Sequence, residues 1–228
     1  HADHAGGNRY FQQNTGCKIF APGIEACIAN HPILEPALLY GGAPCKALRH
    51  KFLMAQESEC HDITSPDFPA EIEVIPLHGH IFDMVGYRTP DDVVFLADCV
   101  SSAATLEKYK IAYLYDVQAY LDTLDYVDTL TAKLFVPSHT EPTEDIHELT
   151  DTNRRCVSDV RDKILSICAE PASFEAILQR IFTDYGLSLN FEQYALVGST
   201  LRSYLSWLLD SGKLAVSFED NLLLWRAV

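Results

Sequence analysis

Four short pieces of the sequence carry side chains that bind metal ions. They are His1-Ala2-Asp3-His4, Gly79-His80, Asp98 and Ser138-His139, in that order. Imidazole nitrogen and carboxylate oxygen without cysteine sulfur suit zinc, iron or manganese. Three such groups within four residues require a tight turn, because a regular helix or strand would point them in different directions. Gly6 and Gly7 then allow a helix to start close to the metals.

Each piece alone has an ordinary explanation. A Gly-His pair is more often a surface or core feature than a ligand, and a lone Asp after a strand often caps a helix. All four pieces in order, each beside a predicted strand or helix, favour a metal site. Five other histidines are predicted to be structural or exposed: His31, His50, His61, His78 and His147. Of these, His78 would share one side of a strand with His80 and could support it.

Alternating and continuous apolar runs predict the elements that must position these groups. We expect Asp98 and His139 to lie at strand ends, where loops converge on one rim. A helix ending at Gly16 follows the first motif. The predicted strands cover 17–21, 71–77, 84–89, 93–97 and 133–137, and the predicted helices cover 22–30, 116–130 and 143–169.

The segment 31–62 contains several Pro and Gly residues and is predicted to be an irregular excursion, of the kind that often forms a lid or rim. Its basic residues Arg49, His50 and Lys51 could recognise a carboxylate or phosphate, although a solvated patch is the simpler interpretation. Tyr113 and Tyr115 could form an aromatic wall for a substrate or pack in the core.

The last 58 residues differ from the rest in pattern. Helices over 173–185, from about 191, and over 199–210, followed by a hairpin that turns at Asp220-Asn221, predict a winged-helix-like unit. We therefore expect a metal-binding domain over 1–169 and this subdomain over 170–228. The third helix offers only Arg202 as a cation, so packing against the body or a second copy of the chain is the preferred role.

The net charge of the chain limits the classes of partner that it can bind. The chain has 228 residues, 17 Lys and Arg, 32 Asp and Glu, and a net charge of −15, which argues against nucleic acid or an anionic membrane. No apolar run is long enough to span a bilayer. Seven widely spaced cysteines without a Cys-x-x-Cys motif indicate reduced thiols and a cytoplasmic location, and no signal peptide is visible.

The order of these motifs resembles the metallo-β-lactamase-fold hydrolase superfamily, whose pattern is His-x-His-x-Asp-His, a distant Gly-His, a strand-end Asp and a late His. The resemblance covers residues 1 to about 145, and the tail resembles the winged-helix appendage of some relatives. It implies an α/β fold, the four-layer αββα sandwich. The first His of the pattern would precede His1, so we expect a longer natural protein with further strands upstream.

The resemblance also implies two metal sites. One would use the preceding His, His1 and His80; the other would use Asp3, His4 and His139, with Asp98 bridging them. Two zinc ions are expected, with iron or manganese as alternatives, and Asp3 and Asp98 are the expected catalytic carboxylates. Ala97 stands where many relatives have Gly, a difference expected to affect only packing.

The implied activity is hydrolysis of a small ester, thioester, lactone or phosphodiester by a hydroxide held between the metals. Two alternatives remain open. An iron-containing sulfur-dioxygenase-like enzyme would keep similar ligands. A nucleic-acid-processing hydrolase would dock through the winged helix, which the acidic charge disfavours. Hydrolysis of β-lactams is not favoured.

Overall fold

A mixed four-stranded sheet forms the centre of the protein in the computed structural model, which describes residues 1–228. The strands lie in the order β3-β4-β5-β6; β3, β4 and β5 are antiparallel neighbours, and β6 runs parallel to β5. Their bounds are β3 (Glu73–Pro76), β4 (Val85–Arg88), β5 (Val93–Ser101) and β6 (Leu134–His139). The predicted strands in this region are confirmed with small changes at their ends.

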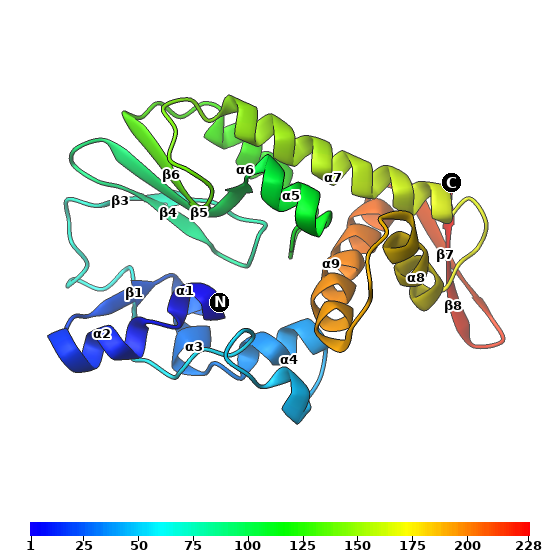
Figure 1. The fold of residues 1–228 in the computed structure, drawn as a ribbon, viewed down its shortest axis with the longest axis horizontal. Helices are drawn as coiled ribbons and strands as arrows, with labels where there is room; N and C mark the ends of the chain where they lie inside the picture. The colour runs from blue at the N-terminus through cyan, green and yellow to red at the C-terminus, as the bar shows by residue number, and fades with distance from the viewer.

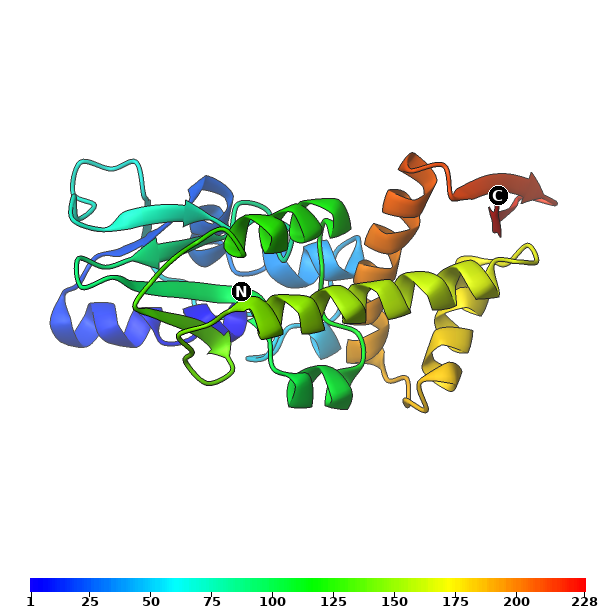
Figure 2. The same cartoon turned by 90° about the horizontal axis from the view of Figure 1, so that it is seen from above.

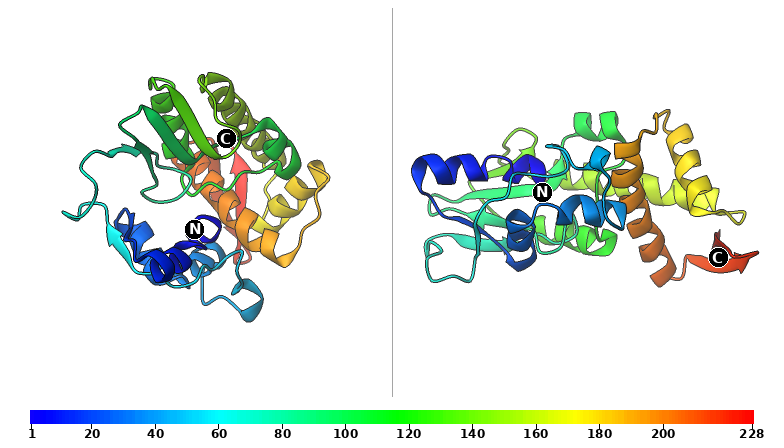
Figure 3. Two further views of the ribbon diagram at one scale, coloured as in Figure 1. Left: turned by 60° about the vertical axis from the view of Figure 1, so that its left-hand side comes forward. Right: turned by 90° about the horizontal axis from the view of Figure 1, so that it is seen from below.

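The central sheet is covered on both sides: helices lie on one side, and helices together with a smaller sheet lie on the other (Figures 1 and 3). On one side are α5 (Ala103–Tyr109), α6 (Val117–Val127) and α7 (His147–Ile167). On the other side are α1 (Ala2–Ala5), α2 (Asn8–Thr15), α3 (Gly23–Asn30) and the parallel pair β1 (Ile19–Ala21) and β2 (Cys60–Asp62). This mixture of helices and sheets is the predicted α/β class.

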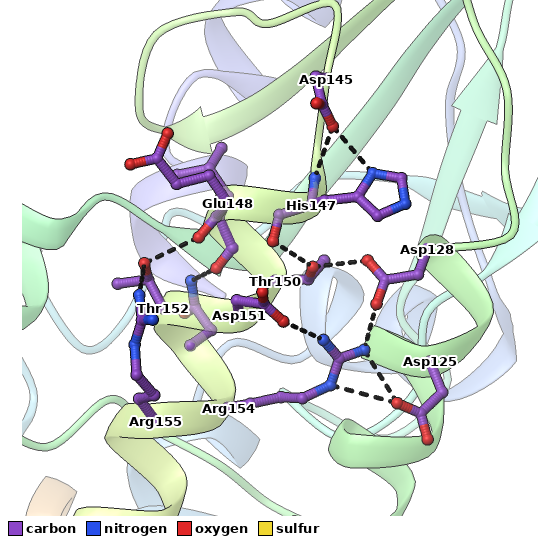
Figure 4. A network of polar contacts seen from close by, with 12 residues as sticks. Asp125, Asp128, Asp145, His147, Glu148, Thr150, Asp151, Thr152, Arg154 and Arg155 are labelled. Atoms are coloured by element: carbon purple, nitrogen blue, oxygen red, sulfur yellow. Dashed lines mark hydrogen bonds and ion pairs between the residues drawn. The ribbon is translucent and has the colours of Figure 1, made fainter.

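An ion-pair network holds the start of α7 against the end of α6 (Figure 4). The Arg154 guanidinium contacts the carboxylates of Asp125, Asp128 and Asp151. Thr150 Oγ1 donates a hydrogen bond of 2.6 Å to Asp128. Because Asp125 and Asp128 belong to the end of α6 and Arg154 to α7, the network fixes two helices that support the sheet.

At the far end of α7 lie α8 (Phe174–Asp184), α9 (Phe191–Asp210) and a hairpin of β7 (Leu214–Glu219) and β8 (Leu222–Ala227) (Figure 2). The hairpin turn is confirmed: Asp220 and Asn221 both have positive φ angles. The expected break between a second and a third helix is wrong, since α9 runs through it. Its buried stripe continues across Gly198 from Ala195 to Leu208, and this burial outweighs the roughly 1 kcal/mol that a helical glycine costs.

One hydrophobic core extends from the sheet into this region. It includes Val94 of β5, Ile164 of α7, Ile177 of α8 and Leu205 of α9. A winged-helix fold is not confirmed, and the division at residue 170 stays a prediction.

The segment 31–62 is more regular than expected. It contains α4 (Leu34–Tyr40) and a single 3-10 turn at Lys46–Leu48. Pro36 is accommodated because it lies in the first turn of α4, where backbone N–H groups lack helical partners anyway. The helix packs against α9. Among all the helices, none combines the length and apolarity that crossing a membrane requires.

Candidate metal centre

Four imidazole rings surround one buried carboxylate. Asp98 has a side chain only 6% exposed, and the Nε2 atoms of His1, His4, His80 and His139 lie 2.9, 3.0, 3.4 and 3.2 Å from its oxygens. Asp3 joins the group, with Oδ2 lying 3.5 Å from His139 Nε2 and Oδ1 in contact with His1 Nδ1. The structure therefore brings together all six residues that the motifs single out.

The two oxygens of Asp98 face different partners. Oδ2 faces His1 and His80, whose Nε2 atoms are 3.0 Å apart, and Oδ1 faces His139 and His4. His4 also lies 3.0 Å from Oδ2. The resemblance also pairs His1 with His80 and His4 with His139, and the assignment of these pairs to two metal ions stays a prediction.

The donor set fits a metal centre. Asp98 Oδ1 is buried without a hydrogen-bond partner, although two imidazole nitrogens lie within 3.2 Å of it. A buried oxygen in this position is costly unless a hydrogen bond or a cation satisfies it. The ligand atoms of His1, Asp3, His4 and Asp98 all lie within 4.8 Å of one another, as groups that share metal ions do.

Protonation follows burial and pairing. Burial lowers the pKa of His80 to about 4, so its ring is neutral and able to bind a metal at pH 7. Burial alone would lower the pKa of His1 and raise that of Asp98. Both effects are reversed by hydrogen bonds: the two residues bond each other, His1 also bonds Asp3, and Asp98 also bonds His4. The pKa of His1 rises to about 10, and that of Asp98 falls below its usual range.

Backbone conformation places His80. Gly79 has φ +111°, and a Cβ atom there would lie 2.2 Å from the backbone nitrogen of Tyr120, so only glycine fits this turn. The carbonyl of Gly79 accepts hydrogen bonds of 3.0 Å from the N–H groups of Tyr115 and Asp116, just before α6. The segment is a turn and not a strand, so His78 points elsewhere: its Nδ1 lies 3.3 Å from the Phe82 carbonyl.

Asp98 lies inside β5 and not at its end, which corrects the expectation. The strand alternates inward and outward up to Leu96, and then the register with β6 shifts on both sides of Ala97. Ala97 has φ +46°, a left-handed conformation that costs a side-chain-bearing residue about 1 kcal/mol. The Ala at this position therefore affects the backbone and not only packing. Beyond it, Asn153 of α7 bonds both backbone groups of Ser101 and holds the strand end.

The first motif differs from the expected turn in one respect: residues 2–5 form a single helical turn, α1, with Asp3 and His4 adjacent on it. Glu35 of α4 supports this turn and was missed by sequence reasoning. The residue is 7% exposed, its carboxylate faces the Ala2 backbone, and burial raises its pKa to about 7. The signal in the sequence was one acid within the otherwise apolar run of α4.

A cavity of about 390 Å³ opens beside the cluster and includes His1, His80, Asp98 and His139 in its wall. Tyr113 lines it as well, with its ring centroid 5.4 Å from that of His80. Tyr115 packs on Phe82 outside the cavity. Of the two tyrosines, only Tyr113 therefore belongs to the wall of the site.

The comparisons with known proteins agree with this geometry. Residues 1–139 match the family described as the metallo-beta-lactamase superfamily. A search of curated proteins found no match.

Two solved structures share the fold. A metallo-beta-lactamase family protein from Thermus thermophilus is 12% identical with a TM-score of 0.68, covering 97% of this chain and 75% of its own. A beta-lactamase domain protein from Burkholderia ambifaria is 16% identical with a TM-score of 0.69, covering 100% of this chain and 71% of its own.

Proposed function

The chain belongs to the metallo-beta-lactamase superfamily, and from that premise we propose that it is a dinuclear metal hydrolase, with zinc as the expected metal, acting on a small ester, thioester, lactone or phosphodiester. The observation that carries the proposal is the placement of Asp98 between two groups of imidazoles, one facing each carboxylate oxygen. A purely structural ion pair needs one cation, not four histidines with one oxygen left unsatisfied.

The residues divide into two ligand groups. His1 and His80 would hold one ion; Asp3, His4 and His139 would hold the other, and Asp98 would contact both. The chemistry such ions supply is Lewis acidity, which polarises a carbonyl or phosphoryl oxygen and acidifies water.

The chain's own carboxylates then have separate tasks. Burial tends to raise the pKa of Asp3, but its hydrogen bond to His1 and the neighbouring histidines lower it, so the carboxylate is ionised at neutral pH. Its side chain is 53% exposed, so water reaches it and it can accept a proton from an attacking water molecule. Asp98 is buried and keeps its charge, so it holds the two histidine groups at fixed positions.

The substrate we propose is a small molecule and not a nucleic acid. Arg202, the single cation of 199–210, donates a hydrogen bond of 3.1 Å to the Gly198 carbonyl and lies 4.0 Å from the centroid of the Phe174 ring. A DNA-reading helix needs free cations along one face. Seven free cysteines suit the reducing cytoplasm, where we place the protein.

Metal content per chain tests the proposal first, measured by plasma mass spectrometry on protein purified without added metal. We expect about two zinc ions per chain, as in dinuclear sites of this donor chemistry, and hydrolysis of at least one class in a panel of esters, thioesters, lactones and phosphodiesters. Iron in place of zinc, with oxygen consumption and no hydrolysis, would move the dioxygenase alternative ahead. Metal-free protein without activity would refute the dinuclear assignment for this chain.

A further inference from the structure

The cavity beside the metal centre continues away from it into an apolar region. It runs from His80 and Asp98 between α4, α5, α9 and the segment 111–114. Its volume of about 390 Å³ falls within the range of sites for small organic molecules. A substrate that reaches the metals therefore has space for a further group on this side.

Aliphatic side chains from distant parts of the sequence make up much of the wall. Leu38 and Leu39 come from α4, Leu106 from α5 and Leu196 from α9, and Ile111 and Leu53 lie in the wall with them. Burial of a substrate's methylene groups against such a wall is favourable by about a factor of four per group. The surface fits an aliphatic chain better than a sugar or a polar head group.

Charge excludes an anionic occupant of this extension. No Lys or Arg lines the cavity; its charged residues are Asp3, Glu35 and Asp98, apart from the histidines. The basic residues of the segment 31–62 do not supply the missing cation, because none of them lines the cavity. His50 pairs instead with Glu192 at 3.0 Å. A phosphate would find ordered cations only at the metals themselves.

Tyr113 adds a polar group to the largely apolar wall. Its ring lies beside that of His80, with the two centroids 5.4 Å apart. Its hydroxyl is buried without a well-formed hydrogen bond, and Ser199 is its polar side-chain neighbour. A hydroxyl in this state can donate a hydrogen bond to a neutral acceptor such as a carbonyl oxygen.

We propose that the substrate is a neutral acyl compound, namely an ester, thioester or lactone of an aliphatic carboxylic acid, with its hydrocarbon chain in this cavity and its carbonyl group at the metal centre. The proposal rests on the proposed hydrolase function and narrows it, because it excludes phosphodiesters. The step is hydrolysis: water adds to the acyl carbon, the bond to the alkoxide or thiolate breaks, and the leaving group takes up a proton.

Binding of linear amides, which resist hydrolysis, tests the cavity apart from catalysis. The purified chain is titrated calorimetrically with butyramide, hexanamide and octanamide. We expect about fourfold tighter binding for each methylene that is buried. In parallel, kcat/KM for p-nitrophenyl esters should rise from acetate to octanoate and exceed that for bis(p-nitrophenyl) phosphate.

A pair of matched variants locates the binding. Phe52 lines the cavity mouth and Phe218 lies on the distant hairpin; both are exposed, at 72% and 74%, so neither substitution should unfold the protein. Phe52→Ser should weaken octanamide binding at least threefold, while Phe218→Ser leaves it unchanged.

The outcomes separate the two proposals. Affinity that is independent of chain length, or a preference for the phosphodiester, would overturn the acyl proposal even if esters are hydrolysed. Amide affinity that rises with chain length and falls in Phe52→Ser would support the acyl site even if no ester were hydrolysed. In that case only the proposed hydrolase function would be refuted.

Discussion

Replacing Asp98 with asparagine keeps the shape of the side chain and removes its charge. In the metal-free protein, the carboxylate is paired with His1 and His4 and is 6% exposed. Loss of one partner from a buried pair costs about 3–5 kcal/mol. Because the pKa of Asp98 is lowered in the folded state, its stabilisation exists above pH 4 and is lost as the pH falls below that. The variant should therefore be less stable than the parent at pH 7.

The rise in Tm on metal binding tests the role of Asp98 more directly than the stability of the metal-free protein. An ion present at 100 times its Kd stabilises the folded state by about 2.7 kcal/mol, which raises the Tm of a chain of this size by about 5–10 °C. Since Asp98 would contact both ions, Asp98→Asn should lose most of this increase for both ions, together with most of the bound metal.

Asp128→Asn is the matched control. Asp128 is also partly buried and ion-paired, with Arg154, but it lies outside the cluster. It should lower the Tm of the metal-free protein and leave both metal content and the metal-induced increase intact. Two ions per chain retained by Asp98→Asn, or equal metal loss in both variants, would refute the bridging assignment.

Three further predictions concern other parts of the fold. Ala97→Gly should raise the free energy of unfolding by about 0.5–1 kcal/mol in urea denaturation, because φ +46° suits glycine; a decrease would contradict the strain at this position. Glu35 has a folded pKa of about 7 against 4.5 when exposed, so its charge destabilises by about 3 kcal/mol above pH 7 and not at all below pH 4.5. Glu35→Gln should therefore stabilise the chelator-treated protein at pH 8 but not at pH 4, and equal effects at both would rule out the buried charge. Deleting residues 171–228 should make the protein insoluble, since α7 shares its core with α8 and α9; a soluble monomer in size-exclusion chromatography would contradict this packing.

The candidate ligands could be found from the sequence because each is marked locally. His1, Asp3 and His4 form one motif, Gly79 marks the turn before His80, and apolar runs precede Asp98 and His139. The β5 bulge could not be found, since nothing in Phe95-Leu96-Ala97-Asp98 indicates a positive φ angle at an alanine. That conformation coincides with the shifts of register between β5 and β6, and the strand end beyond it is held at Ser101 by Asn153, which lies more than fifty residues further along the chain.

The helices differ from the prediction for the opposite reason, because tertiary packing overrides the local sequence signals there. The Pro and Gly residues of 31–62 predict irregular structure, and a new helix is predicted to begin at Ser199, yet Pro36 and Ser199 both lie within helices. The apolar face of each helix is buried against another element, and that burial exceeds the cost of one unfavourable residue. These two helices, α4 and α9, also pack together and form part of the cavity wall.

The sequence marks the candidate ligands but not the residues of the cavity wall. A metal ion needs donors whose types the sequence shows directly. Much of the cavity wall is aliphatic, of a kind that occurs throughout any core, and its members Leu39 and Leu196 are brought together by the packing of α4 on α9. We therefore expect substrate preference to depend on tertiary packing outside the metal motifs. Variants in α4 and α9 should change which acyl chain is bound while leaving the metal content constant, as calorimetry and plasma mass spectrometry on the same samples can show.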